Sequence, residues 1–293
     1  MQTSTMFLRN ITCIDHAWID KDGLIVGGSK HQEILVTGAV DEQEQVVVDF
    51  SNIKKFLKSS IDDKETGYDH KLWIFTEESN CTWSATKNKI TITSPHFAAI
   101  LPLNAVHIIE GSYKDLETDM STYLLDLAVK QYGPGIVDIT VNLTEEQFSK
   151  HTWRQKFTYT HGLKSSTSWG CQNPGHGHLS FVELVGKPGA QPEDLAKLAD
   201  VIARYINGCV LVYKDNVGIE SKNDFTINYD TADRGKFTVS YRKTHPHIFF
   251  DIETTVENIV SVVADKFKAQ LVAAGVEKIF ISEGLSKGAC ANV

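Results

Sequence analysis

The chain has 293 residues and a formal net charge of −8, with 42% hydrophobic and 23% charged residues. This composition is typical of a globular protein, and its acidic balance argues against the basic surface that non-specific nucleic-acid binding requires. No stretch approaches the roughly 20 apolar residues needed to cross a bilayer, no secretory signal is recognisable, and five cysteines without a CxxC favour a cytoplasmic protein.

The first half of the chain predicts two strands and a helix, followed by a second helix and strand. A strand-like stretch ends at His16, and a glycine-rich turn leads into a second strand over 27–38. Apolar residues at helical spacing begin at Phe50 and again at Leu116. An alternating strand then closes the half.

The second half repeats this order. A strand ends at His161, a histidine-bearing strand follows over 175–186, and a helical pattern begins at Pro192. His161 lies 145 positions after His16, and Glu253 lies 136 positions after Glu117, which indicates an internal duplication. We expect two α+β domains, 1–148 and 149–293, each an antiparallel sheet with helices on one face, joined near Gln147–Arg154.

Three histidines of the second half predict a metal site. His176 and His178 are two apart in a stretch rich in strand-forming residues, so both side chains project from one face of a sheet. A hairpin would bring His161 beside them. Three imidazoles with an open fourth position are typical of catalytic Zn²⁺, which polarises substrate oxygens.

The first half predicts a degenerate version of this site. Matching His16 with His161 places His31 at the position of His178 and Ser29 at that of His176. Two histidines and a serine form a poor zinc site, so we expect the first domain to bind no metal.

Several stretches resemble one enzyme family. CQNPGHGHLSFVEL resembles the cysteine-plus-HGH signature of the 6-pyruvoyltetrahydropterin and 6-carboxytetrahydropterin synthases, with His161 matching their upstream histidine. GYDHKLWI, in the first half, resembles their Leu-Asp-His-Lys motif, and DEQEQVVVDFSNIKKFL resembles the segment that precedes it. TTVENIV and IFISEG resemble the closing helix and strand. The resemblance covers most of both halves, in a tandem two-domain form.

The resemblance implies a fold, a substrate and roles for individual residues. It implies the tunnelling fold (T-fold), in which antiparallel sheets with helices on one side associate into a barrel. The implied substrate is 7,8-dihydroneopterin triphosphate, whose side-chain hydroxyls the zinc would hold. Cys171 and the pair Asp69–His70 would move protons, and Glu283 would bind the pterin ring.

Departures from the family pattern predict a composite site. The second half offers VLVYKDNVG where the family has Asp-His, and the first half has no cysteine before Ser29. Each half therefore lacks what the other retains. We expect zinc, Cys171 and Glu283 from the second domain to meet Asp69 and His70 from a first domain, either in the same chain or in a neighbouring one.

The leading functional hypothesis is a lyase, a 6-carboxytetrahydropterin synthase on the route to 7-deazaguanine bases such as queuosine. The alternatives are a 6-pyruvoyltetrahydropterin synthase and a non-catalytic T-fold protein that binds a pterin or purine. Open sheet edges favour a homo-oligomer, such as a trimer of tandem chains, with no nucleic-acid or membrane partner. Lys164 and Arg234 are candidate phosphate ligands, and either Glu145 or Glu146 could correspond to Glu283.

Overall fold

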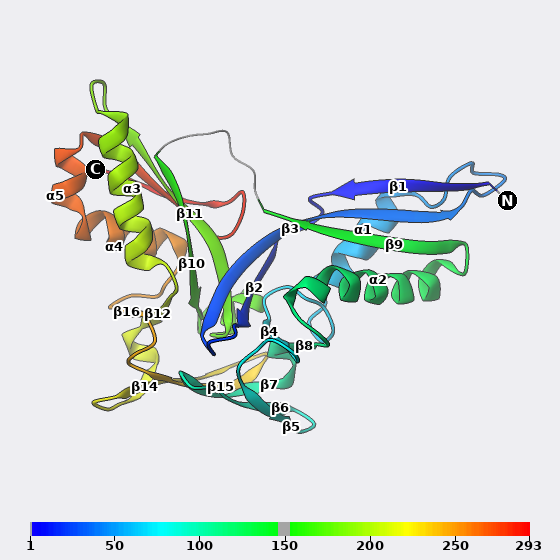
Figure 1. Ribbon diagram of the computed structural model, residues 1–293, viewed down its shortest axis with the longest axis horizontal. Coiled ribbons are helices and arrows are strands. Elements are labelled where there is room, and N and C mark those ends of the chain that lie inside the picture. Colours follow the sequence, from blue (N-terminus) through cyan, green and yellow to red (C-terminus); the bar gives the residue numbers. More distant parts are fainter. Residues whose placement is uncertain (1, 146–152) are drawn as a thin grey trace.

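The computed structural model describes residues 2–145 and 153–293, and Figure 1 shows their arrangement. The predicted helices from Phe50 and Pro192 begin at those residues. The predicted domain boundary at 148/149 lies outside the described residues. The first half consists of β1 (Thr3–Arg9), β2 (Ile14–Ile19), β3 (Ile25–Ala39), α1 (Phe50–Ile61), β4 (Leu72–Phe75), β5 (Thr82–Ala85), β6 (Lys89–Thr93), β7 (Phe97–Pro102), β8 (Val106–Ile109), α2 (Leu116–Tyr132) and β9 (Ile136–Thr144).

The second half follows a similar order of elements. Its first two strands form the hairpin that carries the predicted metal ligands, and its last two strands form a hairpin that ends the chain. Its elements are β10 (Arg154–His161), β11 (His176–Gly186), α3 (Pro192–Ile206), β12 (Cys209–Tyr213), β13 (Val217–Glu220), β14 (Asp224–Thr231), β15 (Gly235–Arg242), β16 (His247–Phe250), α4 (Val256–Lys266), α5 (Lys268–Ala273), β17 (Val276–Ser282) and β18 (Gly288–Asn292).

Each half builds its own sheet, and both sheets are mixed. The first has the order β1-β3-β2-β4-β8, with β9 also paired to β3, and the second has the order β16-β12-β10-β11-β17-β18. The hairpins are antiparallel as expected, but β2-β4-β8 and β10-β12-β16 are parallel. The connections from β2 to β4 and from β10 to β12 include helices α1 and α3, and those from β4 to β8 and from β12 to β16 run through strands of another sheet. Each connection returns the chain in the original direction, which makes these pairs parallel. The α+β class is confirmed, and the expectation of purely antiparallel sheets is wrong.

A third sheet joins the two halves. Its order is β13-β14-β15-β7-β6-β5, and the pairing of Tyr241 with Phe97 belongs to the β15–β7 contact between the halves. One hydrophobic core lies against this sheet and includes Leu72 from the first half and Val210 from the second. The two halves therefore share both a sheet and a core.

Helices cover one face of each half's own sheet. Asp49 caps α1 by accepting a hydrogen bond from the backbone N–H of Asn52, and Ile53, Leu57 and Ile61 of α1 are buried. Helix α3 begins with Pro192, which suits the first turn of a helix because its missing N–H has no partner there. Its buried apolar stripe packs on β10 and β11.

Two glycines allow the two sheets to cross (Figure 1), where β3 passes β11. A Cβ on Gly177 would lie 2.7 Å from Cα of Gly27, and a Cβ on Gly27 would lie 2.1 Å from the carbonyl oxygen of Tyr159. Both neighbours are backbone atoms, which cannot rotate away. The close approach brings the first half against the strand that carries His176 and His178.

Gly27→Ala should lower the free energy of unfolding by about 3 kcal/mol, at the upper end of typical overpacking costs. Denaturant titration of the purified chain measures this change. Gly135→Ala is the matched control, because a Cβ there meets nothing within 4 Å. An equal effect of both substitutions would show that the crossing is not tightly packed.

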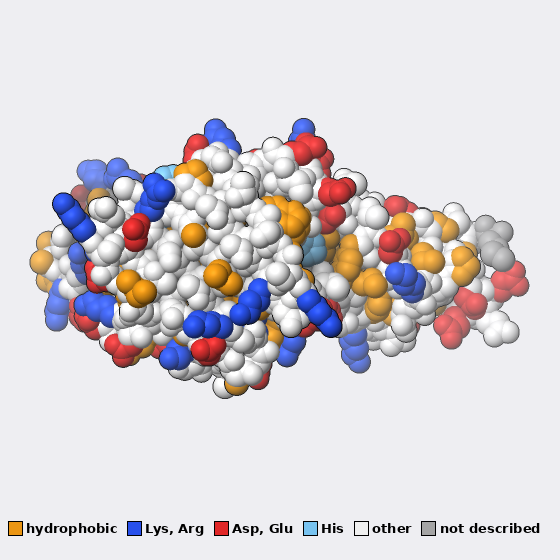
Figure 2. Space-filling model, turned by 90° about the horizontal axis from the view of Figure 1, so that it is seen from below, with side chains coloured by type: hydrophobic (Ala, Val, Ile, Leu, Met, Phe, Trp, Pro, Cys, Tyr) orange, Lys and Arg blue, Asp and Glu red, His pale blue; other side chains and the backbone are white. Residues whose placement is uncertain are grey.

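No helix among the described residues is both long and apolar enough to span a membrane. Figure 2 shows acidic and basic side chains interspersed over one face of the molecule.

Candidate active site at the junction of the two halves

The hairpin β10–β11 brings the three predicted metal ligands together. His161 ends β10 and pairs directly with His176, while His178 lies two residues further along β11. All three side chains are buried, and their candidate ligand nitrogens lie within 4.8 Å of one another. The strand period of two and the hairpin register are together sufficient to produce this cluster.

The partners of the Nδ1 atoms of His161 and His176 fit a metal site. Nδ1 of His161 lies 2.8 Å from the carbonyl oxygen of Thr254, and Nδ1 of His176 lies 2.6 Å from that of Asn173. Because a carbonyl only accepts, these nitrogens carry the proton and leave Nε2 with its lone pair. Nε2 of His176 is buried without a partner in the described part of the chain, and Nε2 of His161 and His178 face each other at 3.1 Å. Such a set of converging lone pairs suits a cation.

Burial keeps the imidazoles of His161 and His176 neutral. It lowers the pKa of His161 well below its ordinary value, and the neighbouring His178 lowers it further. Burial and the adjacent His161 do the same to the pKa of His176. Neutral imidazole is the form that binds a metal.

The predicted proton-relay residues lie beside this cluster, in the same chain. Nε2 of His70 is 3.7 Å from Sγ of Cys171, and Nδ1 of His70 is 2.6 Å from Oδ2 of Asp69. The His70 ring lies 5.1 Å from the ring of His176. His70 has a φ of +55°, a left-handed conformation that is uncommon for a residue with a side chain. The turn before β4 thus directs this imidazole at the second half.

The charges of this trio favour a thiolate next to an imidazolium. Burial alone would lower the pKa of His70, but the carboxylate of Asp69 outweighs it and raises that pKa well above its ordinary value. Burial raises the pKa of Cys171, but the hydrogen bond to His70 and its charge lower the pKa overall. A lowered thiol pKa is characteristic of reactive cysteines.

Asp15, on β2, links the relay residues to the histidine cluster. Its backbone N–H donates to Oδ1 of Asp69 at 2.9 Å, and its carbonyl accepts from the backbone N–H of His70 at 2.6 Å. Its buried carboxylate lies 3.2 Å from Nδ1 of His178. Burial would raise the pKa of this carboxyl, but His178 and Lys287 hold it well below its usual value. Nothing in the sequence pattern singles out Asp15.

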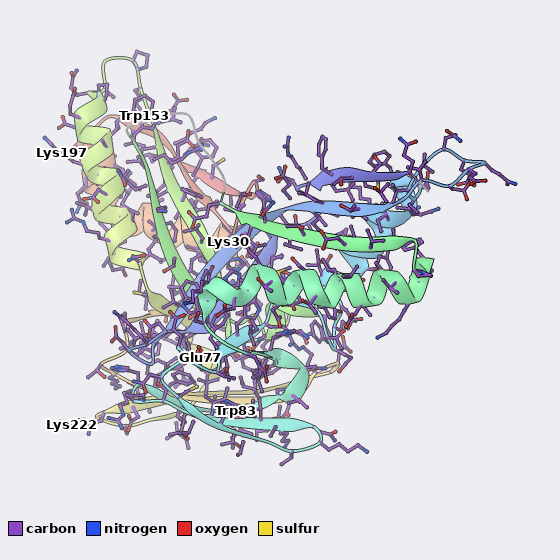
Figure 3. All side chains as sticks on the ribbon, turned by 45° about the vertical axis from the view of Figure 1, so that its right-hand side comes forward. Lys30, Glu77, Trp83, Trp153, Lys197 and Lys222 are labelled. Carbon is purple, nitrogen blue, oxygen red and sulfur yellow. The ribbon has the colours of Figure 1, made fainter. Side chains whose placement is uncertain are left out.

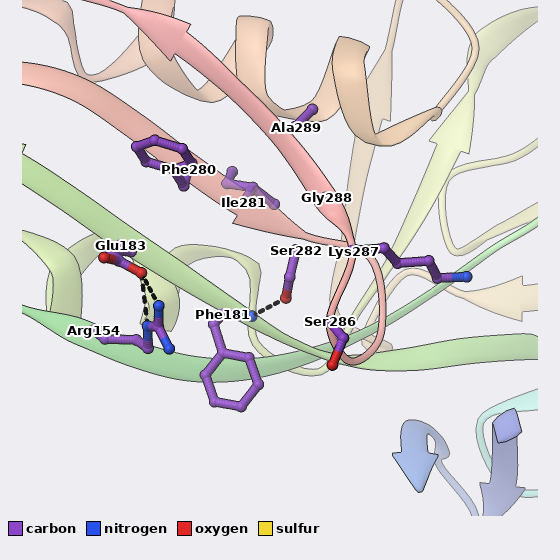
Figure 4. A pocket seen from close by; sticks show the side chains of 10 residues that line it. All are labelled: Arg154, Phe181, Glu183, Phe280, Ile281, Ser282, Ser286, Lys287, Gly288 and Ala289. Carbon is purple, nitrogen blue, oxygen red and sulfur yellow. Dashed lines mark hydrogen bonds and ion pairs between the residues drawn. The ribbon is translucent and has the colours of Figure 1, made fainter. Parts of the chain in front are cut away.

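Glu283 lies in the turn between β17 and β18. Its backbone N–H donates to the carbonyl of Lys287, and its charge contributes to raising the pKa of the buried phenol of Tyr159, which burial raises most. Nζ of Lys287 lies 3.1 Å from Oδ2 of Asp15. Figure 4 shows Lys287 in this turn, among the residues that line a pocket with Phe181 and Phe280. The turn therefore lies against the histidine cluster.

Arg234 holds the loop that carries Cys171. Its guanidinium donates to the carbonyl oxygens of Trp169 and Gly170 and lies 3.6 Å from the centre of the Trp169 ring. The side chain is buried, with its hydrogen bonds directed at protein atoms. This geometry disfavours Arg234 as a phosphate ligand. The other candidate, Lys164, lies close to Glu253: its charge lowers the pKa of that carboxyl, although burial has the larger effect and raises it.

Each half contains an arginine–glutamate ion pair between its first strand and the long neighbouring strand, and these two pairs align the halves. Arg9 pairs with Glu33 across β1 and β3, and Arg154 pairs with Glu183 across β10 and β11. Counting from the two glutamates, Gly27 takes the position of Gly177, and these are the glycines that meet where the sheets cross.

This register corrects the predicted match between the halves. The positions of His161, His176 and His178 are occupied by Trp18, Val26 and Gly28, rather than by His16, Ser29 and His31. None of the three can bind a metal. The predicted strand end at His16 is also wrong, because β2 continues to Ile19.

His16 has a different environment from the second-half histidines. Its ring stacks on Trp73 at 3.6 Å with an interplanar angle of 9°, and its side chain is fully buried. Burial lowers the pKa of His16 to about 3. Within the described residues it belongs to no cluster of potential metal ligands.

No family model and no curated protein matches this chain. Among solved structures it is similar to a catalytic-residue mutant of Plasmodium vivax 6-pyruvoyltetrahydropterin synthase (12% identity, TM-score 0.39), covering 49% of this chain and 92% of that one. It is also similar to the Plasmodium falciparum enzyme of that name (15%, TM-score 0.34), covering 51% and 97%, and to an uncharacterized protein from Wolinella succinogenes (12%, TM-score 0.32), covering 47% and 94%.

Proposed function

We propose that the protein is a zinc-dependent 6-carboxytetrahydropterin synthase acting on 7,8-dihydroneopterin triphosphate. The observation that carries the proposal is the contact between Cys171 and the His70–Asp69 pair at the edge of a buried three-histidine cluster. A metal centre, a thiol and a carboxylate-bound imidazole supply the Lewis acid, base and acid that rearrangement of a polyol side chain requires.

His161, His176 and His178 would hold the zinc through Nε2, and the metal would polarise the side-chain hydroxyls of the substrate. Cys171, as a thiolate, would remove a proton from a neighbouring carbon of that side chain. His70 would give and take protons on the other side, with Asp69 fixing its tautomer through Nδ1. The carboxylate of Glu283 would accept hydrogen bonds from the amino and ring N–H groups of the pterin, which fixes the ring orientation.

The shared element order and the matching arginine–glutamate pairs support a tandem duplication of a T-fold unit, with domains 1–148 and 149–293. After duplication, one site can draw its metal ligands from one copy and its relay pair from the other. Asp69 and His70 reach Cys171 within one chain, so each chain would have one complete site. Open sheet edges at β1 and β18 would allow association into an oligomer of tandem chains.

The direct test is incubation of the zinc-loaded chain with 7,8-dihydroneopterin triphosphate, followed by mass spectrometry of the pterin and an acetaldehyde assay. Formation of 6-carboxytetrahydropterin with acetaldehyde is the expected result. Triphosphate release without acetaldehyde would assign the 6-pyruvoyltetrahydropterin synthase reaction instead. Binding of the substrate without turnover would leave only a pterin-binding protein.

Asp15→Asn should weaken zinc binding by about 10- to 100-fold, the usual effect of losing a carboxylate that orients a metal-binding histidine. The substitution keeps the backbone bonds to Asp69 and His70 but removes the charge beside His178. Competition with a chromophoric chelator measures the affinity, and the visible spectrum of the cobalt-substituted protein reports ligand geometry. Lys287→Met is the matched control, because it removes the other charged partner of Asp15 without touching an imidazole. Unchanged affinity and spectrum in Asp15→Asn would contradict this role.

A further inference from the structure

A second cavity lies where the two sheets meet, apart from the histidine cluster. Its volume is about 520 Å³, and both halves line it. The aromatic, charged and amide side chains that line it are Trp18, Lys30 and Tyr113 from the first half, Lys156 and Asn207 from the second, and Glu145 after β9. Figure 3 shows Lys30 at this junction, between the second-half sheet and the strands of the first half.

The strand register makes this cavity the counterpart of the candidate active site. Glu33 pairs with Asn142 across β3 and β9, and Glu183 pairs with Phe280 across β11 and β17. Three residues beyond these partners lie Glu145 and Glu283, respectively. Glu145, rather than Glu146, therefore takes the position of the proposed ring-binding carboxylate.

A second correspondence supports the same match. Oδ1 of Asn207 accepts a hydrogen bond from the backbone N–H of Thr158 at 2.9 Å, just before β12. Oδ1 of Asp69 accepts one from the backbone N–H of Asp15 at the same distance, just before β4. The amide of Asn207 thus stands where the relay carboxylate stands in the candidate active site.

This second cavity lacks the metal-binding histidines of the candidate active site, but it has aromatic side chains and a carboxylate that can bind a planar ring. Trp18 and Gly28 occupy the positions of two metal ligands, so no zinc can be held there. Trp18 and Tyr113 supply aromatic surface, with ring centres 5.3 Å apart. The glutamate at the strand end is retained.

The charges of the cavity indicate what kind of substituent its ligand carries. The two oxygens of Glu145 lie 3.2 Å from Nζ of Lys30 and 3.2 Å from Nζ of Lys156. Two ammonium groups facing one carboxylate leave an excess positive charge. When the edge of a ring engages Glu145, the lysines are released for an anionic group on the ligand.

We propose that this cavity is a second, non-catalytic binding site for a planar 2-amino-4-oxo heterocycle that carries an anionic substituent. Glu145 accepts from the amino and ring N–H groups, Trp18 and Tyr113 contact the ring face, and Lys30 and Lys156 bind the substituent. The choice of a pterin-like ring rests on the proposed function, since it transfers the role of Glu283 to Glu145. A chain with this site binds two such molecules and transforms one.

The test is calorimetric titration of the zinc-loaded chain with 6-carboxypterin, a stable planar pterin with a carboxylate. We expect two molecules per chain for the unaltered protein. Glu145→Gln should leave one, with the affinity of the lost site reduced at least tenfold, and Glu283→Gln should also leave one. The double variant should bind none. Glu44→Gln, in an exposed turn, is the matched control and should still bind two.

The outcomes separate this inference from the proposed function. One molecule per chain, lost in Glu283→Gln and unchanged in Glu145→Gln, would overturn the second site and leave the proposed function standing. Two molecules with neither glutamate required would overturn the second site and also the role of Glu283. Glu145 is exposed, so its substitution should not disturb folding, and circular dichroism checks this.

Discussion

His176→Ala should reduce bound zinc from about one ion per chain to a small fraction and lower turnover of 7,8-dihydroneopterin triphosphate by at least about 1,000-fold. The reason is geometric: the ring of His176 lies 4.9 Å from that of His161 and 5.1 Å from that of His178, and its buried Nε2 has no partner among the described residues. Atomic absorption of the dialysed protein measures the metal, and the pterin assay measures turnover.

His31→Ala is the control that makes this experiment specific. Matching the histidines of the two halves by sequence alone gives His31 the position of His178 in a site expected to bind no metal, and the strand register places His31 outside every ligand cluster of the described residues. It should therefore retain zinc and activity. Loss of zinc in His31→Ala, or its retention in His176→Ala, would refute the assignment of the metal site to β10 and β11.

Cys171→Ala and His70→Ala should each lower turnover by about 100- to 10,000-fold while zinc remains bound, because each removes one member of a relay and leaves the three metal ligands intact. The double variant should be little worse than either single variant, since residues that act as a unit are not additive. Zinc analysis and single-turnover kinetics of the three variants test this prediction.

Mixing the two single variants tests where the site forms. Sγ of Cys171 and Nε2 of His70 are 3.7 Å apart within one chain, so a mixture of Cys171→Ala and His70→Ala chains should not recover activity. The unaltered chain at the same total concentration is the reference. Recovery toward one quarter or more of its rate would mean that the relay is completed between chains.

The metal cluster is the part of the site that local sequence determines most directly. Residues two apart on a strand share a face, and a hairpin places the end of the preceding strand opposite them. These two local rules suffice to bring together His161, His176 and His178. The helices beginning at Phe50 and Pro192 are equally local, because an apolar stripe at helical spacing and a capping or proline residue define each.

The match between the halves could not be read from the histidines. Arg9 lies nine positions before Trp18, whereas Arg154 lies seven positions before His161. The additional residues fall between β1 and β2, where Asn10 adopts a positive φ. Such an insertion shifts residues that look alike out of register, and only the strand pairing reveals the shift.

The sequence by itself determined the α+β class, the helix starts and the histidine hairpin, because these depend on periodicity and on neighbours along the chain. Tertiary structure alone decided that Asp69 and His70 meet Cys171 in the same chain, that Asp15 lies beside His178, and that a shared third sheet joins the halves. Those contacts span from about one hundred to more than 160 positions of sequence. They depend on the close crossing of β3 and β11 at two glycines. The residue pattern of a strand shows which of its faces is buried, but it does not show which other strand it will cross.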